Sequence, residues 1–212
     1  MRSNRIRKRS AGHWLRLAGS PAILLLSGGA QAAAGEVPAS VFAALPAGHV
    51  VRASACSRSF DPPHLLCIVV AVRRAEDAAN PPPGAAPPRP VLVYRVTPAG
   101  AQLIDRNDHV VLRRDDGGQC DPFEKDEGGI AVSGRSFTIE NGVACGQHWT
   151  DFVTFRFDPA HRAFIWRSEI LESWRLNDSR APDAEALISD GRTVRRADPK
   201  RPIDLGAYRP SR

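Results

Sequence analysis

The chain has 212 residues, which is enough for one domain with a hydrophobic core and few for two domains of ordinary size. Its net charge of +6 arises from six basic residues that precede every acidic residue: Arg2, Arg5, Arg7, Lys8, Arg9 and Arg16. Residues 33–212 are therefore neutral overall, and the composition gives no support for a nucleic-acid-binding function.

The first 32 residues have the pattern of a secretory signal peptide. An apolar run at 17–26 follows the basic segment, and Ala30-Gln31-Ala32 then places small side chains where signal peptidase requires them. The apolar run is well short of the ~20 residues that a membrane-spanning helix needs. We therefore expect a signal peptide at 1–32 that is cleaved, and a periplasmic or secreted product without a membrane anchor.

The mature chain begins with a lead segment at 33–47, in which residues 41–45 are expected to make a helical turn that ends at Pro46. Residues 49–56 and 64–72 look extended. The second run is apolar at successive positions, which is typical of a central strand buried on both faces.

A proline-rich segment follows, with six prolines in the eleven residues 80–90. Because proline cannot donate to a sheet ladder, this segment is expected to be an exposed loop. Three short strands are predicted after it, at 91–96, 101–104 and 109–112.

Two dipeptides predict tight hairpins within residues 129–146, namely Ser133-Gly134 and Asn141-Gly142. The second is the stronger signal, because Asn-Gly readily takes the positive φ angles of a type I′ turn. In the register that these turns set, Phe137 and Ile139 share one sheet face.

The next strand alternates in the same way, with Val153, Phe155 and Phe157 on the expected core face. Residues 164–174 then return the chain, so 129–174 are expected to form an antiparallel meander of about five strands. The predicted fold class is all-β with minor α.

The predicted architecture is a single antiparallel β domain over residues 48–176, stapled by disulfides. After residue 176 the apolar density falls. Residues 177–212 are therefore expected to be an irregular basic segment, with one short helix at 182–188.

The chain has four cysteines, Cys56, Cys67, Cys120 and Cys145, and an even number in an exported protein indicates disulfides. Of the three possible pairings, Cys56–Cys67 and Cys120–Cys145 are favoured, because each pair brackets a local excursion that contains turn-forming residues. The chain has no Cys-x-x-Cys pattern, so we expect no zinc site, and we expect no other metal or cofactor.

Three short motifs occur in order along the chain: Cys120-Asp121-Pro122-Phe123-Glu124, Phe137-Thr138 and Thr154-Phe155-Arg156. Behind a signal peptide, this order resembles a loosely defined set of uncharacterised bacterial envelope proteins, over residues 48 to 175. The resemblance implies a β-rich fold and an envelope location, and it brings no established activity. An acidic loop that suggests cation binding in the similar proteins is replaced here by residues 57–63, with one carboxylate and an arginine.

The generic enzyme signatures for a nucleophile elbow, a zinc protease or a phosphate-binding loop are absent from the sequence. The candidate catalytic residues are His148 and Asp151, since a histidine beside a carboxylate can act as a general base. The spacing identifies no serine or free thiol as their nucleophile.

The candidate binding residues are Trp149, Asp121 and Glu124. The acidic stretch 115–127 offers oxygen ligands for a hard cation but lacks the register of a calcium loop, so a solvated turn is the favoured interpretation. The leading hypothesis is a non-catalytic domain that binds an envelope protein or glycan, and the alternative is a small envelope hydrolase centred on His148 and Asp151.

Overall fold

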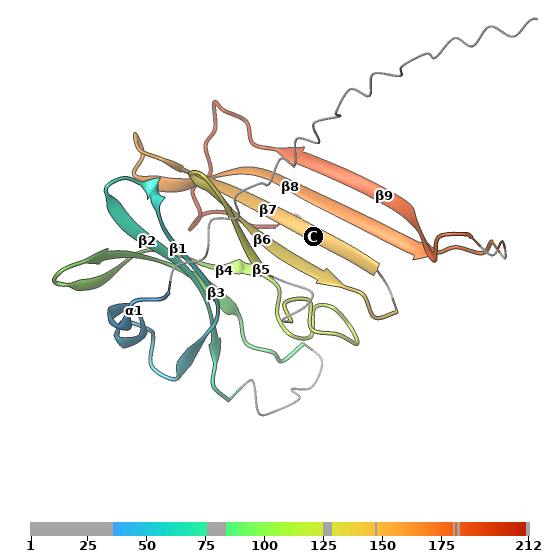
Figure 1. The fold of residues 1–212 in the computed structure, drawn as a ribbon, viewed down its shortest axis with the longest axis horizontal. Coiled ribbons are helices and arrows are strands. Elements are labelled where there is room, and N and C mark those ends of the chain that lie inside the picture. Colours follow the sequence, from blue (N-terminus) through green and yellow to red (C-terminus); the bar gives the residue numbers. More distant parts are fainter. Residues whose placement is uncertain are drawn as a thin grey trace, which may run out of the picture. The chain divides into compact units, whose positions relative to one another are not determined.

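The computed structural model describes residues 36–75, 84–124, 129–146, 148–179, 181 and 183–210. These residues belong to one compact unit and form two antiparallel sheets and a short helix (Figure 1). The all-β fold with a minor helical part is therefore confirmed. The expected signal peptide and residues 80–83 of the predicted proline-rich loop lie outside the described residues. The predicted loop is too long, because residues 89 and 90 are buried at the start of a strand. In the described ranges, no helix has the length and apolar character needed to cross a membrane.

The first sheet, sheet A, has four strands in sequential order. They are β1 (His49–Asp61), β2 (His64–Arg73), β3 (Arg89–Thr97) and β4 (Gly100–Val111). Strand β2 lies between β1 and β3 and is buried on both faces, as its continuous apolar run predicts. The two short strands expected at 101–104 and 109–112 are parts of the single strand β4.

The outer face of sheet A is covered by the lead segment, whose helix α1 (Ala39–Ala43) begins two residues before the expected turn. Val41 packs there against Val69 and Leu92 in a small buried cluster. The hydroxyl of Tyr94 donates to the carbonyl of Ala44 at 3.1 Å. The lead segment therefore explains why odd-numbered residues of β2 are apolar as well as even-numbered ones.

The second sheet, sheet B, has five strands, also in sequential order. They are β5 (Gly129–Ser133), β6 (Ser136–Val143), β7 (His148–Asp158), β8 (Ala163–Leu176) and β9 (Leu187–Arg196). An antiparallel meander is present as expected, but residues 129–174 contain four of its strands and not five, and the fifth strand is β9. The predicted hairpins also differ from those observed.

The predicted turn at Asn141-Gly142 is wrong, because both residues lie inside β6 and pair with Asp151 and Thr150 of β7. The Asn141 side chain is fully buried and bonds to the backbone of β4, and the Gly142 amide donates to the Pro122 carbonyl at 2.8 Å. These tertiary hydrogen bonds outweigh the local turn preference.

The other predicted turn is present at the β5–β6 hairpin, where Ser133 pairs with Ser136 and Gly134 has a φ of 55°. Strand β6 instead connects to β7 through residues 144–147, of which Ala144 to Gly146 are described.

The segment after residue 176 is not irregular throughout, so that part of the prediction is also wrong. The helix expected at 182–188 is not formed in the described residues, because 187–188 begin strand β9. Strand β9 is an exposed edge strand with few buried side chains. Its sequence therefore lacks the apolar alternation that identifies a strand with one buried face.

Residues 203–208, here called the strap, pass between the two sheets. The Leu205 amide donates to the Phe164 carbonyl and the Trp166 amide to the Ile203 carbonyl, each at 2.8 Å. Leu205 and Tyr208 are buried in the main core. The expected domain boundary at residue 176 is therefore too early, because the core contains side chains from the strap.

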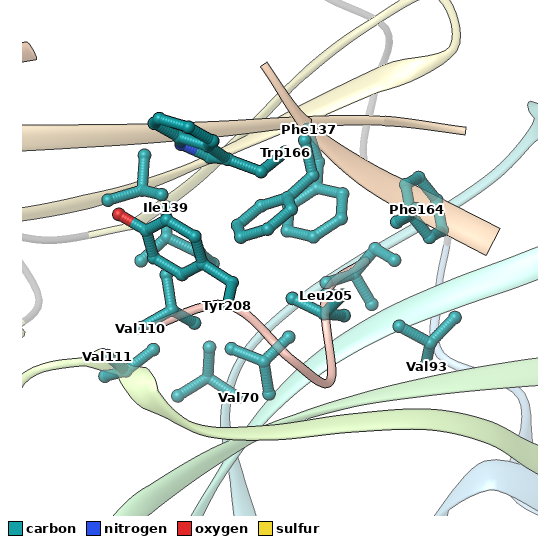
Figure 2. Close-up of a cluster of buried hydrophobic side chains, with 14 of the residues drawn as sticks. Val70, Val93, Val110, Val111, Phe137, Ile139, Phe164, Trp166, Leu205 and Tyr208 are labelled. Carbon is teal, nitrogen blue, oxygen red and sulfur yellow. The ribbon is translucent and has the colours of Figure 1, made fainter. Parts of the chain in front are cut away.

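The main core lies between the inner faces of the two sheets (Figure 2). Phe60 of β1 contacts Phe164 of β8 edge to face with ring centroids 5.3 Å apart, and Tyr208 contacts Phe155 in the same way at 5.3 Å. Val153, Phe155 and Phe157 are all buried there, as the strand alternation predicts.

Asn107 connects the strap to β4. Its side-chain amide donates to the carbonyls of Leu205, at 2.6 Å, and Tyr208, at 2.9 Å. Its side-chain oxygen accepts from the amides of His109 and Val110, each at 2.8 Å. Asn107 is almost completely buried, so these four bonds replace the water that the amide group would otherwise bind.

We expect Phe155→Ala to lower the free energy of unfolding by about 3 to 5 kcal/mol, because truncation leaves a cavity in the main core. His148 is half-buried on the outer face of sheet B, so His148→Ala is expected to stay within about 0.5 kcal/mol. Urea unfolding of both variants tests this. Equal losses would show that His148 is a structural residue.

We expect Asn107→Ala to destabilise the protein by about 3 to 5 kcal/mol, because two carbonyls and two amides lose their partner in a buried site. The matched control is Asn177→Ala, since the side chain of Asn177 accepts a local, exposed hydrogen bond from the Ser179 amide. Thermal and urea denaturation measure both. Similar midpoints for the two variants would contradict the role given to Asn107.

Candidate functional site

The inner face of sheet B continues beyond the main core and forms one wall of a cleft of about 660 Å³. Trp149, Leu171 and Ser173 line this wall from β7 and β8. Leu171 is 43% exposed although it lies on the inner face, where it pairs with Asp151 across the strands. A large apolar side chain thus remains open to solvent inside a concave site.

The opposite wall comes from β4 and the loop that follows it. Its polar groups are Asp108, His109, Arg113 and Asp116, and its apolar groups are Val111 and Leu112. Pro210, just after the strap, also lines the cleft.

A bulge in β4 brings Asp108 and His109 to the cleft. Arg89 pairs with Val111 and Val91 with Asn107, so residues 108–110 of β4 lie opposite the single residue Pro90. Proline has no amide hydrogen to donate to the ladder, which favours the irregularity at this position. Bulges often re-aim side chains next to functional sites.

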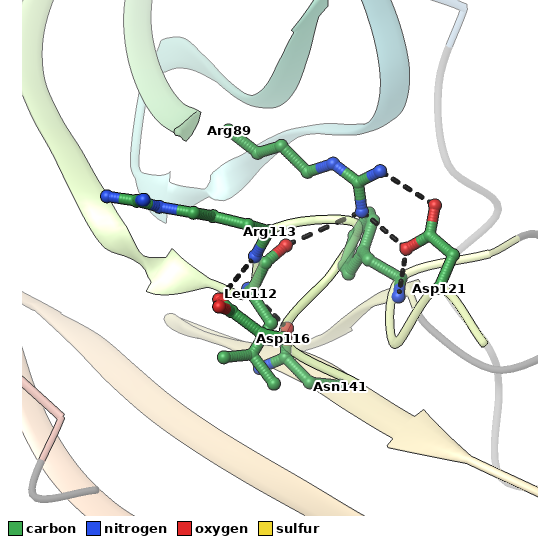
Figure 3. A network of polar contacts seen from close by, with 7 residues as sticks. Arg89, Leu112, Arg113, Asp116, Asp121 and Asn141 are labelled. Atoms are coloured by element: carbon green, nitrogen blue, oxygen red, sulfur yellow. Dashed lines mark hydrogen bonds and ion pairs between the residues drawn. The ribbon is translucent and has the colours of Figure 1, made fainter. Parts of the chain in front are cut away.

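Residues 112–124, here called the cleft loop, are fixed to both sheets by buried polar contacts (Figure 3). The Asn141 side-chain amide donates to the Val110 carbonyl at 3.1 Å, and its oxygen accepts from the Leu112 amide at 3.0 Å. Asn141 thus joins β6 of sheet B to the end of β4 in sheet A. This contact sets where the cleft loop begins.

Arg89 and Asp121 form a two-pronged ion pair that holds the middle of the cleft loop, with Nη2 and Oδ2 2.7 Å apart. Asp121 also accepts from the Phe123 amide at 2.9 Å. Burial alone would raise the pKa of Asp121, but the hydrogen bonds from Arg89 and Phe123 and the positive charge of Arg89 outweigh it, so its pKa lies below the ordinary value.

A disulfide and a close backbone contact also hold the cleft loop in place. The disulfides pair as the sequence predicts, Cys56 with Cys67 inside sheet A and Cys120 with Cys145 between the cleft loop and the end of β6. At Gly117 a Cβ atom would lie 2.3 Å from the Cys120 carbonyl oxygen and 2.8 Å from a methyl group of Val143. Only glycine fits this close approach without movement of the backbone.

The structure separates the two candidate catalytic residues. His148 pairs with Trp174 and Asp151 with Leu171 in an uninterrupted stretch of β7, and positions three apart in a strand lie on opposite faces. His148 is on the outer face, whereas Asp151 is buried on the inner face. They form no acid–base pair, which removes the basis of the hydrolase alternative.

The candidate binding residues have different environments. Trp149 lines the cleft, Asp121 is held in its ion pair with Arg89, and Glu124 is exposed at the end of the cleft loop. The segment Asp121-Pro122-Phe123-Glu124 therefore anchors the loop, because Phe123 is buried in the main core as well.

Two further carboxylates of the acidic stretch 115–127 have separate partners. Asp115 accepts from the Ala86 amide at 3.3 Å, and Asp116 accepts from the Arg113 amide at 2.8 Å. The described part of the chain has no group of three or more His, Cys, Asp or Glu side chains placed to hold a metal ion. Residues 125–128 lie outside the described residues.

The cleft offers binding groups rather than an assembled catalytic set. Asp108 pairs with Arg106 at 2.7 Å, and in the described ranges no hydrogen bond joins His109 to Ser173, Asp108 or Asp116. Sequence reasoning missed these residues because they come from distant elements. One local signal points to this part of the site: the break predicted between the strands 101–104 and 109–112 lies close to the irregular part of β4.

Comparisons with models of protein families, with curated proteins and with solved structures found no match. The resemblance to bacterial envelope proteins therefore stays a prediction. The function proposed below is therefore argued from the geometry of the cleft.

We expect the protein to lose stability as the pH falls below about 4, because the folded state lowers the pKa of Asp121 from 3.8. The stabilisation from the ionised carboxylate is complete above the unfolded pKa and disappears as the pH falls through the folded one. Asp121→Asn should cost about 3 kcal/mol at pH 7 and flatten the pH dependence below about pH 4.

Urea unfolding at a series of pH values measures this effect. The control is Asp183→Asn, an exposed carboxylate outside the cleft loop, which should follow the wild-type curve. An unchanged slope in Asp121→Asn would show that other groups cause the acid sensitivity.

Proposed function

We propose that the protein is an exported, non-catalytic binding domain that holds a saccharide of the cell envelope in the cleft. The observation that carries the proposal is the uncovered inner face at Trp149 and Leu171, which faces a wall of polar side chains from the β4 bulge. This arrangement gives the cleft an apolar side and a hydrogen-bonding side.

The size and chemistry of the cleft support a small hydroxylated ligand. Its volume of about 660 Å³ lies within the range of ordinary ligand sites, which combine apolar walls with a few polar groups. An indole ring such as that of Trp149 offers a flat apolar surface for the face of a sugar ring.

The polar side chains around the cleft also suit a saccharide. Asp108 and Asp116 offer acceptors, Arg113 offers donors, and Ser173 and His109 offer both. Sugar hydroxyls are donors and acceptors at once, so a wall of mixed groups matches them better than a wall of one charge.

Export is supported by two independent features. The first 32 residues have the charged, apolar and small-residue pattern of a signal peptide. The two disulfides are bonds that form and persist in oxidising compartments outside the cytoplasm. Both features favour a periplasmic or secreted location.

A glycan array of bacterial surface and cell-wall saccharides, followed by titration of Trp emission, tests the proposal. The mature protein should bind at least one saccharide, and Trp149→Ala or Leu171→Asp should weaken that binding at least tenfold, which is about 1.4 kcal/mol. Both residues line the cleft without entering the main core, so the variants should still fold.

The matched control is Trp174→Ala, because Trp174 is half-buried on the outer face of sheet B beside His148. It should bind like the wild type. The proposal fails if no saccharide binds, if extended peptides bind the cleft in place of saccharides, or if Trp149→Ala and Trp174→Ala have the same effect.

A further inference from the structure

A second pocket, of about 310 Å³, lies at the other end of sheet B. It is lined by the β5–β6 turn, the end of β7, the start of β8 and the segment after β9. Arg156 of this pocket and Trp149 of the cleft lie seven residues apart along β7, about 23 Å at the usual rise of a strand. The two pockets are therefore separate sites.

Three arginines from different elements line this pocket: Arg135, Arg156 and Arg167. Arg135 is at the β5–β6 turn, and Arg156 pairs across the sheet with Ser136 and Ile165. Arg167 is the extra residue of a bulge in β8, since Phe155 pairs with Trp166 and Thr154 with Ser168.

None of the three guanidinium groups has an ion-pair partner within the described residues. The carboxylates that line the pocket are bonded to groups other than these arginines. Asp158 accepts from the Ala160 amide at 2.8 Å and contacts His161 at 3.0 Å, and Asp198 accepts from the Lys200 amide at 2.9 Å. The arginines thus retain donors for a ligand.

The backbone that carries the arginines is fixed. The Phe157 amide donates to the Arg135 carbonyl at 2.8 Å, and the Ala197 amide donates to the Arg167 carbonyl at 2.9 Å. Pro159, Pro199 and Pro202 also line the pocket and restrict its walls. A site with a rigid frame loses less entropy when a ligand binds.

We propose that this pocket binds a phosphate group, either as free phosphate or as the phosphate of a lipid headgroup. A guanidinium group makes paired hydrogen bonds to the oxygens of a carboxylate or a phosphate. A carboxylate has two oxygens and satisfies one such group, whereas a phosphate offers three or four and can engage several arginines together. Three arginines around a small pocket therefore favour phosphate.

Calorimetric titration of the mature protein with inorganic phosphate and with glycerol phosphate tests the site, at low ionic strength because salt screens exposed charges. Flotation with vesicles of phosphatidylglycerol, against vesicles of phosphatidylcholine alone, tests the lipid source. Arg156→Gln and Arg167→Gln, at exposed positions that leave the fold intact, should each weaken binding at least tenfold.

The control is Arg192→Gln, which removes the same charge from β9 outside the pocket, where Arg192 is paired with Glu172. It should change binding by less than twofold. If the anionic vesicles bind and inorganic phosphate competes with them, the ligand is the phosphate of a lipid headgroup. If phosphate binds and the vesicles do not, the ligand is free phosphate. Both results support the site.

The proposal is overturned if neither phosphate nor the anionic vesicles bind, or if Arg192→Gln weakens binding as much as the pocket variants do. Saccharide binding in the cleft should be unaffected by Arg156→Gln, because the two sites are at opposite ends of β7. Failure of one proposal is therefore distinguishable from failure of the other.

Discussion

The side chain of Asn107 is the contact on which the rest of the structure depends. Its amide joins β4 to strap residues 98 and 101 positions further along the chain, and its oxygen holds the bulge that follows it in β4. The bulge presents Asp108 and His109 to the cleft, and the strap leads to Pro210 on the same rim. One buried amide group thus stabilises the core and shapes the candidate site.

Unequal coverage of the two sheets explains where the pockets lie. Strands β7 and β8 have 11 and 14 residues, and the main core covers only the part of them around Val153, Phe155 and Phe164. On one side of this part the inner face opens into the cleft. On the other side the arginine-lined pocket forms among turns. The two pockets thus lie on either side of the part of sheet B that the main core covers.

Prediction from sequence succeeded where a local pattern and the tertiary environment agree. The doubly apolar run of β2 fits its position between two strands and two buried faces, and the alternation of Val153, Phe155 and Phe157 fits their burial. It failed where distant groups decide the outcome. Asn141 bonds to β4 across the two sheets, so Asn-Gly does not turn, and the cleft combines residues from β4, β7 and β8 that no spacing rule connects. Strand β9 lacks an apolar period because its side chains stay largely exposed in the part of the chain that the structure describes.

The strap also adds long-range contacts to a fold that is otherwise built from neighbouring segments. Each sheet is a sequential meander, so its hairpins form from contacts between neighbouring segments at low entropic cost. The filled space between the sheets also includes Leu205 and Tyr208, which pack against strands that lie far earlier in the chain. Without the strap in place, the facing phenylalanines would be exposed to association with other chains. The contact between β4 and the strap thus joins residues 98 and 101 positions apart in the sequence.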